Sequence, residues 1–219
     1  MKQEISNRNL FGLGVAVAVL SVLLGTVLWK WQGNLQSRGA SEQRPLEGLE
    51  TFGAILPFSL TDKDGRPVTL SNLEGKVSIV NFIYTNCPDT CPIQSAQMRQ
   101  IQEDFKNERD LRLVSITVDP TRDTPEVLSD YAKRFGADPE RWWFLTGEKE
   151  AIHKLARKGF RLAAAGIPKA RRPESGATHS PRFVLIDRKA QIRGYYISTD
   201  SDALERLQQD LKIFLTDET

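Results

Sequence analysis

The 219 residues are enough for one domain of ordinary size and a short additional segment. Lys and Arg number 30 and Asp and Glu number 28, which gives a formal net charge of +2, and residues 1–49 alone carry a net +2. Residues 50–219 are therefore electrically neutral, so the charge gives no argument for nucleic-acid binding.

An uncharged stretch separates Arg8 from Lys30, and residues 10–29 are almost wholly apolar. A helix of ~20 residues rises about 30 Å, which is the thickness of the hydrocarbon core of a bilayer. We therefore expect a tail over residues 1–9, a transmembrane anchor over residues 10–31 and a linker over residues 32–50. A cleaved signal peptide is the alternative, but its apolar region would be shorter and would end in small residues.

The charges on the two sides of this anchor are nearly balanced, so the positive-inside rule barely discriminates between the two topologies. We adopt the usual topology of a short N-terminal anchor, with the C-terminal side outside the cytoplasm. No Arg- and Ser-rich presequence precedes the anchor, which favours a bacterial cytoplasmic (inner) membrane with the soluble domain facing the periplasm or the exterior.

Residues 51–219 show alternating strand and helix patterns. Residues 58–70 alternate around Asp64-Gly65 and predict a β-hairpin. The patterns predict further strands at 77–84, 111–118, 142–146, 183–186 and 191–197, and helices at 92–106, 125–135, 148–158 and 202–215. In the second helix, which begins with Thr124 as N-cap, we expect Val127, Leu128, Tyr131 and Phe135 to face inward. The order indicates an α/β domain with a mixed sheet and helices on both faces.

The two cysteines of the chain stand in Cys87-Pro-Asp-Thr-Cys91-Pro, between a predicted strand and a predicted helix. Residues at i and i+4 of a helix project to the same side, and a helix N-terminus stabilises thiolates. One helical turn also allows a disulfide between Cys87 and Cys91. An inert buried pair is disfavoured by the flanking prolines. The spacing alone does not choose between metal binding and redox work.

A third ligand beside the two cysteines would favour metal binding over redox work. The chain has two histidines that could supply such a ligand. His153 lies within a predicted helix among basic residues, so we expect it on the surface. His179 ends an irregular segment just before a predicted core strand, at a sheet end where functional groups collect; a structural histidine is the alternative. Two thiolates and an imidazole suit copper, whereas structural zinc would need a fourth ligand. Asp119 is either a hydrogen-bond acceptor for the imidazole or a turn residue.

Three blocks of the chain resemble the Sco/SenC family of membrane-anchored, thioredoxin-like copper proteins that take part in assembling cytochrome c oxidase. The first is Asn81-Phe-Ile-Tyr-Thr-Asn-Cys87-Pro-Asp-Thr-Cys91-Pro, the second is Ser115-Ile-Thr-Val-Asp119-Pro-Thr-Arg-Asp123-Thr-Pro-Glu126, and the third is Thr178-His179-Ser180 with the strand after it. The resemblance covers residues 50–215 and implies a thioredoxin-like fold with Cys87, Cys91 and His179 as copper ligands.

Two positions near His179 bear on the interpretation. Thr178 stands where many members of the family carry an acidic residue. Pro181 lies close to where thioredoxin-like reductases place a cis-proline beside their thiols, and a cis bond there would favour redox work.

The leading hypothesis is a copper metallochaperone that passes copper to a copper-binding subunit of a cytochrome oxidase. The alternative is an enzyme, a thiol–disulfide oxidoreductase that reduces the cysteines of such a subunit, with Cys87 attacking and Cys91 resolving. A copper or redox sensor is a third option, disfavoured because the sequence shows no output domain.

Overall fold

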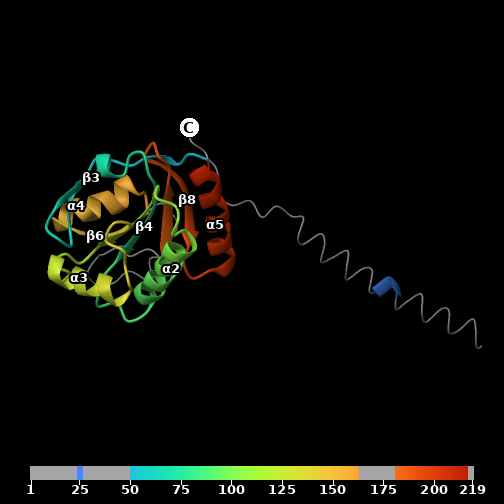
Figure 1. Ribbon diagram of the computed structural model, residues 1–219, viewed down its shortest axis with the longest axis horizontal. Helices are drawn as coiled ribbons and strands as arrows, with labels where there is room; N and C mark the ends of the chain where they lie inside the picture. The colour runs from blue at the N-terminus through green and yellow to red at the C-terminus, as the bar shows by residue number, and fades with distance from the viewer. Residues whose placement is uncertain (1–23, 27–49, 163–180, 217–219) are drawn as a thin grey trace, which may run out of the picture. The chain divides into compact units, whose positions relative to one another are not determined.

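The computed structural model describes residues 24–26, 50–162 and 181–216. The chain divides into two units, residues 1–44 and 45–219 (Figure 1). Of the predicted anchor, the structure describes residues 24–26, which are helical and exposed; the rest lies outside the described residues. Across the described ranges, none of the helices has the length and apolar character needed to span a membrane.

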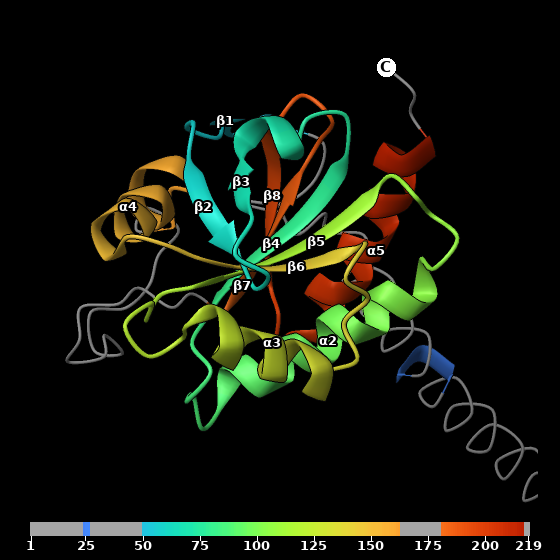
Figure 2. The ribbon, with the colours of Figure 1, turned by 60° about the vertical axis from the view of Figure 1, so that its left-hand side comes forward.

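An eight-stranded mixed sheet, counted over the described residues, forms the centre of the second unit, in the order β1-β8-β7-β4-β5-β6-β2-β3 (Figure 2). Neighbouring strands are parallel from β4 to β6 and antiparallel elsewhere. The strands are β1 Gly53–Ala54, β2 Ser59–Asp62, β3 Pro67–Thr69, β4 Val77–Ile83, β5 Leu111–Thr117, β6 Trp142–Thr146, β7 Arg182–Ile186 and β8 Gln191–Ile197. The predicted mixed α/β sheet is confirmed.

Helices cover both faces of this sheet, as predicted. The helices are α2 Thr90–Asp104, α3 Pro125–Arg134, α4 Lys149–Lys154 and α5 Ser201–Thr216, with a 3₁₀ turn η1 Leu70–Asn72 and a π-helical turn η2 Leu155–Gly159. One apolar core lies under α2, α3 and α5, and a second lies under α4 and η2. The successive crossovers from β4 to β5 and from β5 to β6 run in one direction, so right-handed connections place α2 and α3 on the same face.

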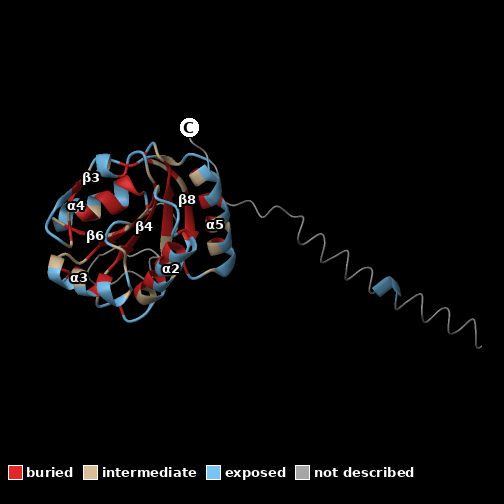
Figure 3. Ribbon diagram, in the orientation of Figure 1, coloured by how far each residue is buried: buried red, intermediate tan, exposed pale blue. Residues whose placement is uncertain are grey.

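Strand β4 is buried along its whole length (Figure 3). Its side chains alternate between the two cores. Ile79 and Ile83 pack toward the α2 side, and Val80 and Phe82 pack toward the α4 side. Parallel pairing with β5 is continuous from Val77 to Ile83. The carboxyl end of β4 is therefore a fixed point, and the segment that follows it begins from a rigid support.

Some expectations need correction. Val127 is 39% exposed, although it was expected to face inward. Leu128 packs with Tyr131 in the core, and Val127, about 100° around the helix from Leu128, lies outside the buried face. His153 was expected on the surface but is partly buried, with Nε2 3.4 Å from the carbonyl oxygen of Val118. The two-residue strand β1 was missed because it is too short to carry a pattern.

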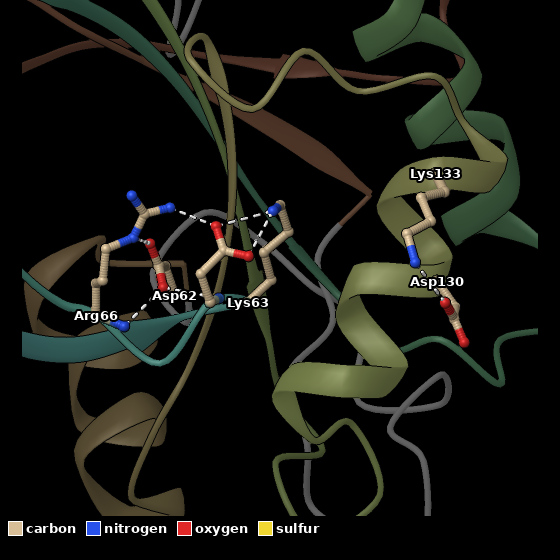
Figure 4. Close-up of polar contacts among 6 residues, drawn as sticks. Asp62, Lys63, Arg66, Asp130 and Lys133 are labelled. Carbon is tan, nitrogen blue, oxygen red and sulfur yellow. Dashed lines mark hydrogen bonds and ion pairs between the residues drawn. The ribbon is translucent and has the colours of Figure 1, made fainter.

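The predicted hairpin is formed by β2 and β3, and a single carboxylate closes its turn (Figure 4). Asp62 Oδ1 accepts hydrogen bonds from the backbone N–H groups of Asp64 and Arg66, both at 2.8 Å. Asp62 Oδ2 accepts a third from Arg66 Nε at 3.1 Å. Gly65 supplies the positive φ of +79° that the turn requires.

Substitution of Asp62→Ala should lower the free energy of unfolding by about 2 kcal/mol, because two backbone N–H groups lose their acceptor. Urea denaturation of the reduced full-length chain in mild detergent would measure this change. Asp64→Ala is the matched control on the same turn, since Asp64 is exposed and its ion pairs with Lys63 and Arg66 lie at the surface. Equal effects of the two substitutions would contradict the assignment of the turn to Asp62.

Candidate functional site

The two cysteines lie where β4 passes into α2. A tight turn follows β4, in which the N–H of Cys87 donates to the carbonyl oxygen of Tyr84 at 3.2 Å. Helix α2 begins at Thr90, two residues earlier than predicted, so Cys91 lies in its first turn and Cys87 lies just ahead of it. Both cysteines are free thiols.

The sulfur of Cys87 takes the place of a capping oxygen at the start of α2. The N-cap residue, Asp89, makes no side-chain capping hydrogen bond. Cys87 Sγ instead accepts hydrogen bonds from the N–H of Cys91, at 3.4 Å, and from the N–H of Asp89. Thr90 Oγ1 lies 3.8 Å from the same sulfur. Because the first N–H groups of a helix have no partner within the helix, a negatively charged acceptor is stabilised there.

The two thiols differ in acidity for physical reasons. Burial raises the pKa of Cys87, but the N–H groups of Asp89 and Cys91, followed by the side chains of Cys91 and Tyr84, outweigh it and lower this pKa to about 7. Burial raises the pKa of Cys91 far above its ordinary value, and the neighbouring Cys87 raises it further. At neutral pH the pair therefore holds a large fraction of Cys87 thiolate beside a protonated Cys91.

A buried carboxylate, Asp123, fixes the loop that carries Cys87. Asp123 is 1% exposed and accepts hydrogen bonds from Thr85 N–H at 3.1 Å, from Thr85 Oγ1 at 2.5 Å and from Thr117 Oγ1 at 2.5 Å. These contacts join the segment after β4 to the end of β5. The negative charge of Asp123 also raises the pKa of Cys91, after burial and the neighbouring Cys87. The sequence analysis did not predict that Asp123 fixes this loop. The signal that could have indicated it is an acidic residue in the predicted turn, four positions after Asp119.

The other predicted site residues are not brought together by the described structure. Asp119 is partly exposed, and its Oδ2 lies 3.7 Å from Nε of Arg122. His179 lies outside the described residues, so its contact with the thiols and with Asp119 stays a prediction. The bond between Ser180 and Pro181 also involves a residue outside them, so the cis-proline prediction stays untested; the carbonyl of Pro181 accepts from Ser198 N–H at 2.8 Å.

The thiols supply a donor set for a soft metal ion. The N–H of Cys91 donates to the sulfur of Cys87 at 3.4 Å, so the two cysteines lie next to each other at the start of α2. Two neighbouring thiolates fit a soft ion such as Cu(I). Among the described residues, no three His, Cys, Asp or Glu side chains form a metal-binding group.

A mixed sheet whose central strand delivers two thiols to the start of a helix defines a thioredoxin-like thiol protein. The chain belongs to the SCO1/SenC family, whose model matches residues 49–215. The family resemblance and the thioredoxin-like fold expected from the sequence are thereby confirmed.

Three solved structures are similar to this chain. A SCO1/SenC family lipoprotein from Bacillus anthracis is 32% identical, with a TM-score of 0.65, and covers 74% of this chain and 95% of its own. BsSco, described as a member of the Sco family of cytochrome c oxidase assembly proteins with a disulfide switch, is 29% identical, with a TM-score of 0.64 and coverage of 78% and 98%. Arabidopsis thaliana ScoI with copper bound is 28% identical, with a TM-score of 0.59 and coverage of 74% and 99%.

The difference in acidity predicts how each thiol reacts with iodoacetamide. In the metal-free Cys91→Ser variant, the alkylation rate of Cys87 should rise with pH through a midpoint near 7, because the thiolate is the reactive form. In the Cys87→Ser variant, Cys91 should react slowly and should show no midpoint below pH 9. Mass spectrometry of time points across pH 5–10 would measure both rates; a midpoint for Cys87 at the ordinary thiol value of ~8.5 would contradict the capping arrangement.

Substitution of Asp123→Asn should lower the free energy of unfolding by about 3 kcal/mol, because an amide NH2 group replaces one carboxylate oxygen and opposes the donors that this oxygen accepted from, while the charge that strengthened the remaining hydrogen bonds is lost. Asp119→Asn is the control, since Asp119 is partly exposed and its ion pair is long. Urea denaturation of the reduced full-length variants in mild detergent would compare them. If Asp123→Asn were as stable as Asp119→Asn, Asp123 would not be the anchor of the cysteine loop.

Proposed function

We propose that this protein is a copper metallochaperone, which binds copper through Cys87, Cys91 and His179 and delivers it to a copper-binding subunit of cytochrome c oxidase during assembly. The observation that carries the proposal is the pair of neighbouring thiols at the start of α2, in which the N–H of Cys91 donates to the sulfur of Cys87 and the pKa of Cys87 is lowered to about 7. Membership of the SCO1/SenC family supports it, as do the copper-bound ScoI structure and the cytochrome c oxidase assembly family of BsSco.

In this proposal the protein residues prepare a soft, low-coordinate site. The N–H groups at the start of α2 stabilise the Cys87 thiolate and lower its pKa to about 7, so Cys87 is the thiol that binds the ion first. Cys91 loses its proton when the ion binds, because the ion replaces that proton on the sulfur. His179 completes the set through a neutral ring nitrogen. Cys87, the more exposed of the two thiols at 7%, is the ligand at which a partner's sulfur can enter and accept the ion by ligand exchange.

A second candidate function is thiol–disulfide exchange, and the unequal acidity of the two thiols favours it. The Cys87 thiolate attacks one sulfur of a disulfide in the partner and releases the other sulfur as a thiolate. Cys91 then gives up its proton and attacks Cys87, which frees the second sulfur of the partner. The protein leaves with a Cys87–Cys91 disulfide, having given two electrons to the partner. The disulfide switch reported for BsSco supports this second role.

The proposed location follows from the predicted anchor. With residues 1–9 on the cytoplasmic side and residues 10–31 in a bacterial inner membrane, the linker over residues 32–50 would hold the domain over residues 51–219 in the periplasm or at the exterior. Copper delivery to an oxidase subunit embedded in the same membrane is consistent with this placement.

Substitution of His179→Ala separates the two functions. The copper proposal predicts a large loss of copper affinity, about 100-fold or more, while reduction of a test disulfide by Cys87 and Cys91 is preserved. A competition titration with a copper chelator, on full-length protein in mild detergent, would measure the affinity.

His153→Ala is the matched control, because His153 is the other histidine of the chain and lies against the carbonyl of Val118. The control should bind copper as the wild type does. Unchanged affinity in His179→Ala would remove His179 from the ligand set, and equal losses in both variants would show a general effect of histidine removal.

A further inference from the structure

A pocket lies between the cysteine loop and helix α3, and neither proposed function uses it. Its volume is about 360 Å³, at the lower end of the range of ligand-binding pockets. The loop contributes the two residues that directly precede Cys87, and α3 contributes residues that share one face of the helix. The lining residues are Thr85, Asn86, Val127, Asp130, Tyr131 and Arg134. A group that enters this pocket therefore lies next to the thiol pair.

The apolar part of the pocket is formed by Tyr131 and Val127. Tyr131 is buried in the core under α2 and α3, and its hydroxyl is hydrogen-bonded to Ser95 Oγ of α2 at 3.0 Å. Val127 is 39% exposed, so the core of the domain leaves much of this side chain uncovered. Together they offer apolar surface against which the methylene groups of a long side chain can pack.

The charge of the pocket is carried by Arg134. Asp130 also lines the pocket, but its carboxylate pairs with Lys133 Nζ at 3.2 Å (Figure 4). Arg134 is exposed and has no acidic partner within the described part of the chain. Its guanidinium lies 5.8 Å from the centroid of the Tyr131 ring, within the range of a cation–π contact. Because that ring is fixed in the core, the contact restricts the arginine before anything binds.

Asn86 supplies a second donor from the loop side of the pocket. It is exposed, and its amide forms no hydrogen bond with the residues that the structure describes. A carboxylate in the pocket can accept hydrogen bonds from Arg134 on α3 and from Asn86 on the loop, and a guanidinium fork matches the geometry of a carboxylate. A basic group would instead be repelled by Arg134. The pocket therefore fits an acidic side chain.

We propose that this pocket is the docking site for an acidic segment of the partner protein, which places a carboxylate against Arg134 while the partner's sulfur reaches Cys87. The inference rests on the proposed function and deepens it, because copper transfer and thiol–disulfide exchange both need a partner's sulfur beside Cys87. It names the chemistry of the partner surface, an aspartate or glutamate close in space to the sulfur that reacts.

Activated cysteine peptides are the probe for this docking site. Each peptide is acetylated and amidated, carries thionitrobenzoate on its cysteine, and has one glutamate placed one or two residues before or after the cysteine. A matched set carries glutamine instead. The Cys87 thiolate attacks the peptide sulfur, a disulfide joins Cys87 to the peptide, and thionitrobenzoate leaves with the electron pair of the broken bond. Cys91→Ser prevents a second exchange, and absorbance of released thionitrobenzoate gives the rate.

The rate ratio of a glutamate peptide to its glutamine counterpart is the quantity to compare, because it cancels changes in the reactivity of Cys87. In metal-free full-length Cys91→Ser protein, in mild detergent at pH 7 and low ionic strength, the best-placed glutamate should react about fourfold faster than glutamine, as expected for an exposed charge pair. Adding Arg134→Gln should bring the ratio to about one, since it removes the guanidinium.

Arg99→Gln is the matched control. Arg99 is exposed on α2, carries the same charge and does not line the pocket, so this variant should keep the ratio of the Cys91→Ser protein. Arg134→Glu is a second variant that reverses the charge. It should reverse the preference, so that a lysine peptide reacts about twofold faster than the glutamine peptide at the same position.

Equal rates for glutamate and glutamine at every position would overturn the proposal, and so would equal losses of preference in Arg134→Gln and Arg99→Gln. Both outcomes would leave Cys87 reactive and the thiol exchange function standing. The copper titration of His179→Ala uses no peptide, so unchanged copper affinity there would remove His179 from the copper site and leave the docking pocket intact.

Discussion

The hydrogen bonds from the first N–H groups of α2 to the sulfur of Cys87 are the interaction on which the site depends. A helix end must find acceptors for these groups, and here a side-chain oxygen at the N-cap does not supply one. Cys87 supplies it, which couples the start of the helix to the charge of a thiol. Cys91 is fully buried beside Cys87, and this burial raises the pKa of its thiol far above the ordinary value.

This arrangement needs a rigid support, which the sheet and one carboxylate provide. Strand β4 is buried on both faces, so its end cannot shift without disturbing two cores. Asp123 then binds the segment after β4 to the end of β5 through three hydrogen bonds. Burying a charge costs free energy unless the charged group accepts hydrogen bonds. Fixing the cysteine loop through the buried carboxylate of Asp123 therefore costs part of the stability of the fold.

The sequence allowed prediction of features that depend on local chemistry. Residues close together in the sequence determine three of these features: the apolar strand β4, the Asp64-Gly65 turn, and the start of α3 at Thr124 and Pro125. As predicted, Thr124 Oγ1 caps α3 by accepting a hydrogen bond from the N–H of Val127. The reactive position of the cysteines was likewise visible. Features that depend on partners distant in the sequence could not be predicted: Asp123 accepts a hydrogen bond from Thr85, 38 residues away. Val127 was wrongly predicted to face inward, because the spacing of apolar residues defines the buried face of a helix only to within about one residue.

The central claim is that two sulfurs and one imidazole hold copper together. X-ray absorption at the copper edge, on full-length protein loaded with one equivalent of Cu(I), tests this claim most directly. We predict a first shell of two sulfur atoms and one nitrogen atom, with the outer-shell scattering of an imidazole ring, and loss of that ring signal in His179→Ala. A first shell with one sulfur, or without a histidine contribution in the wild-type protein, would contradict the proposed site.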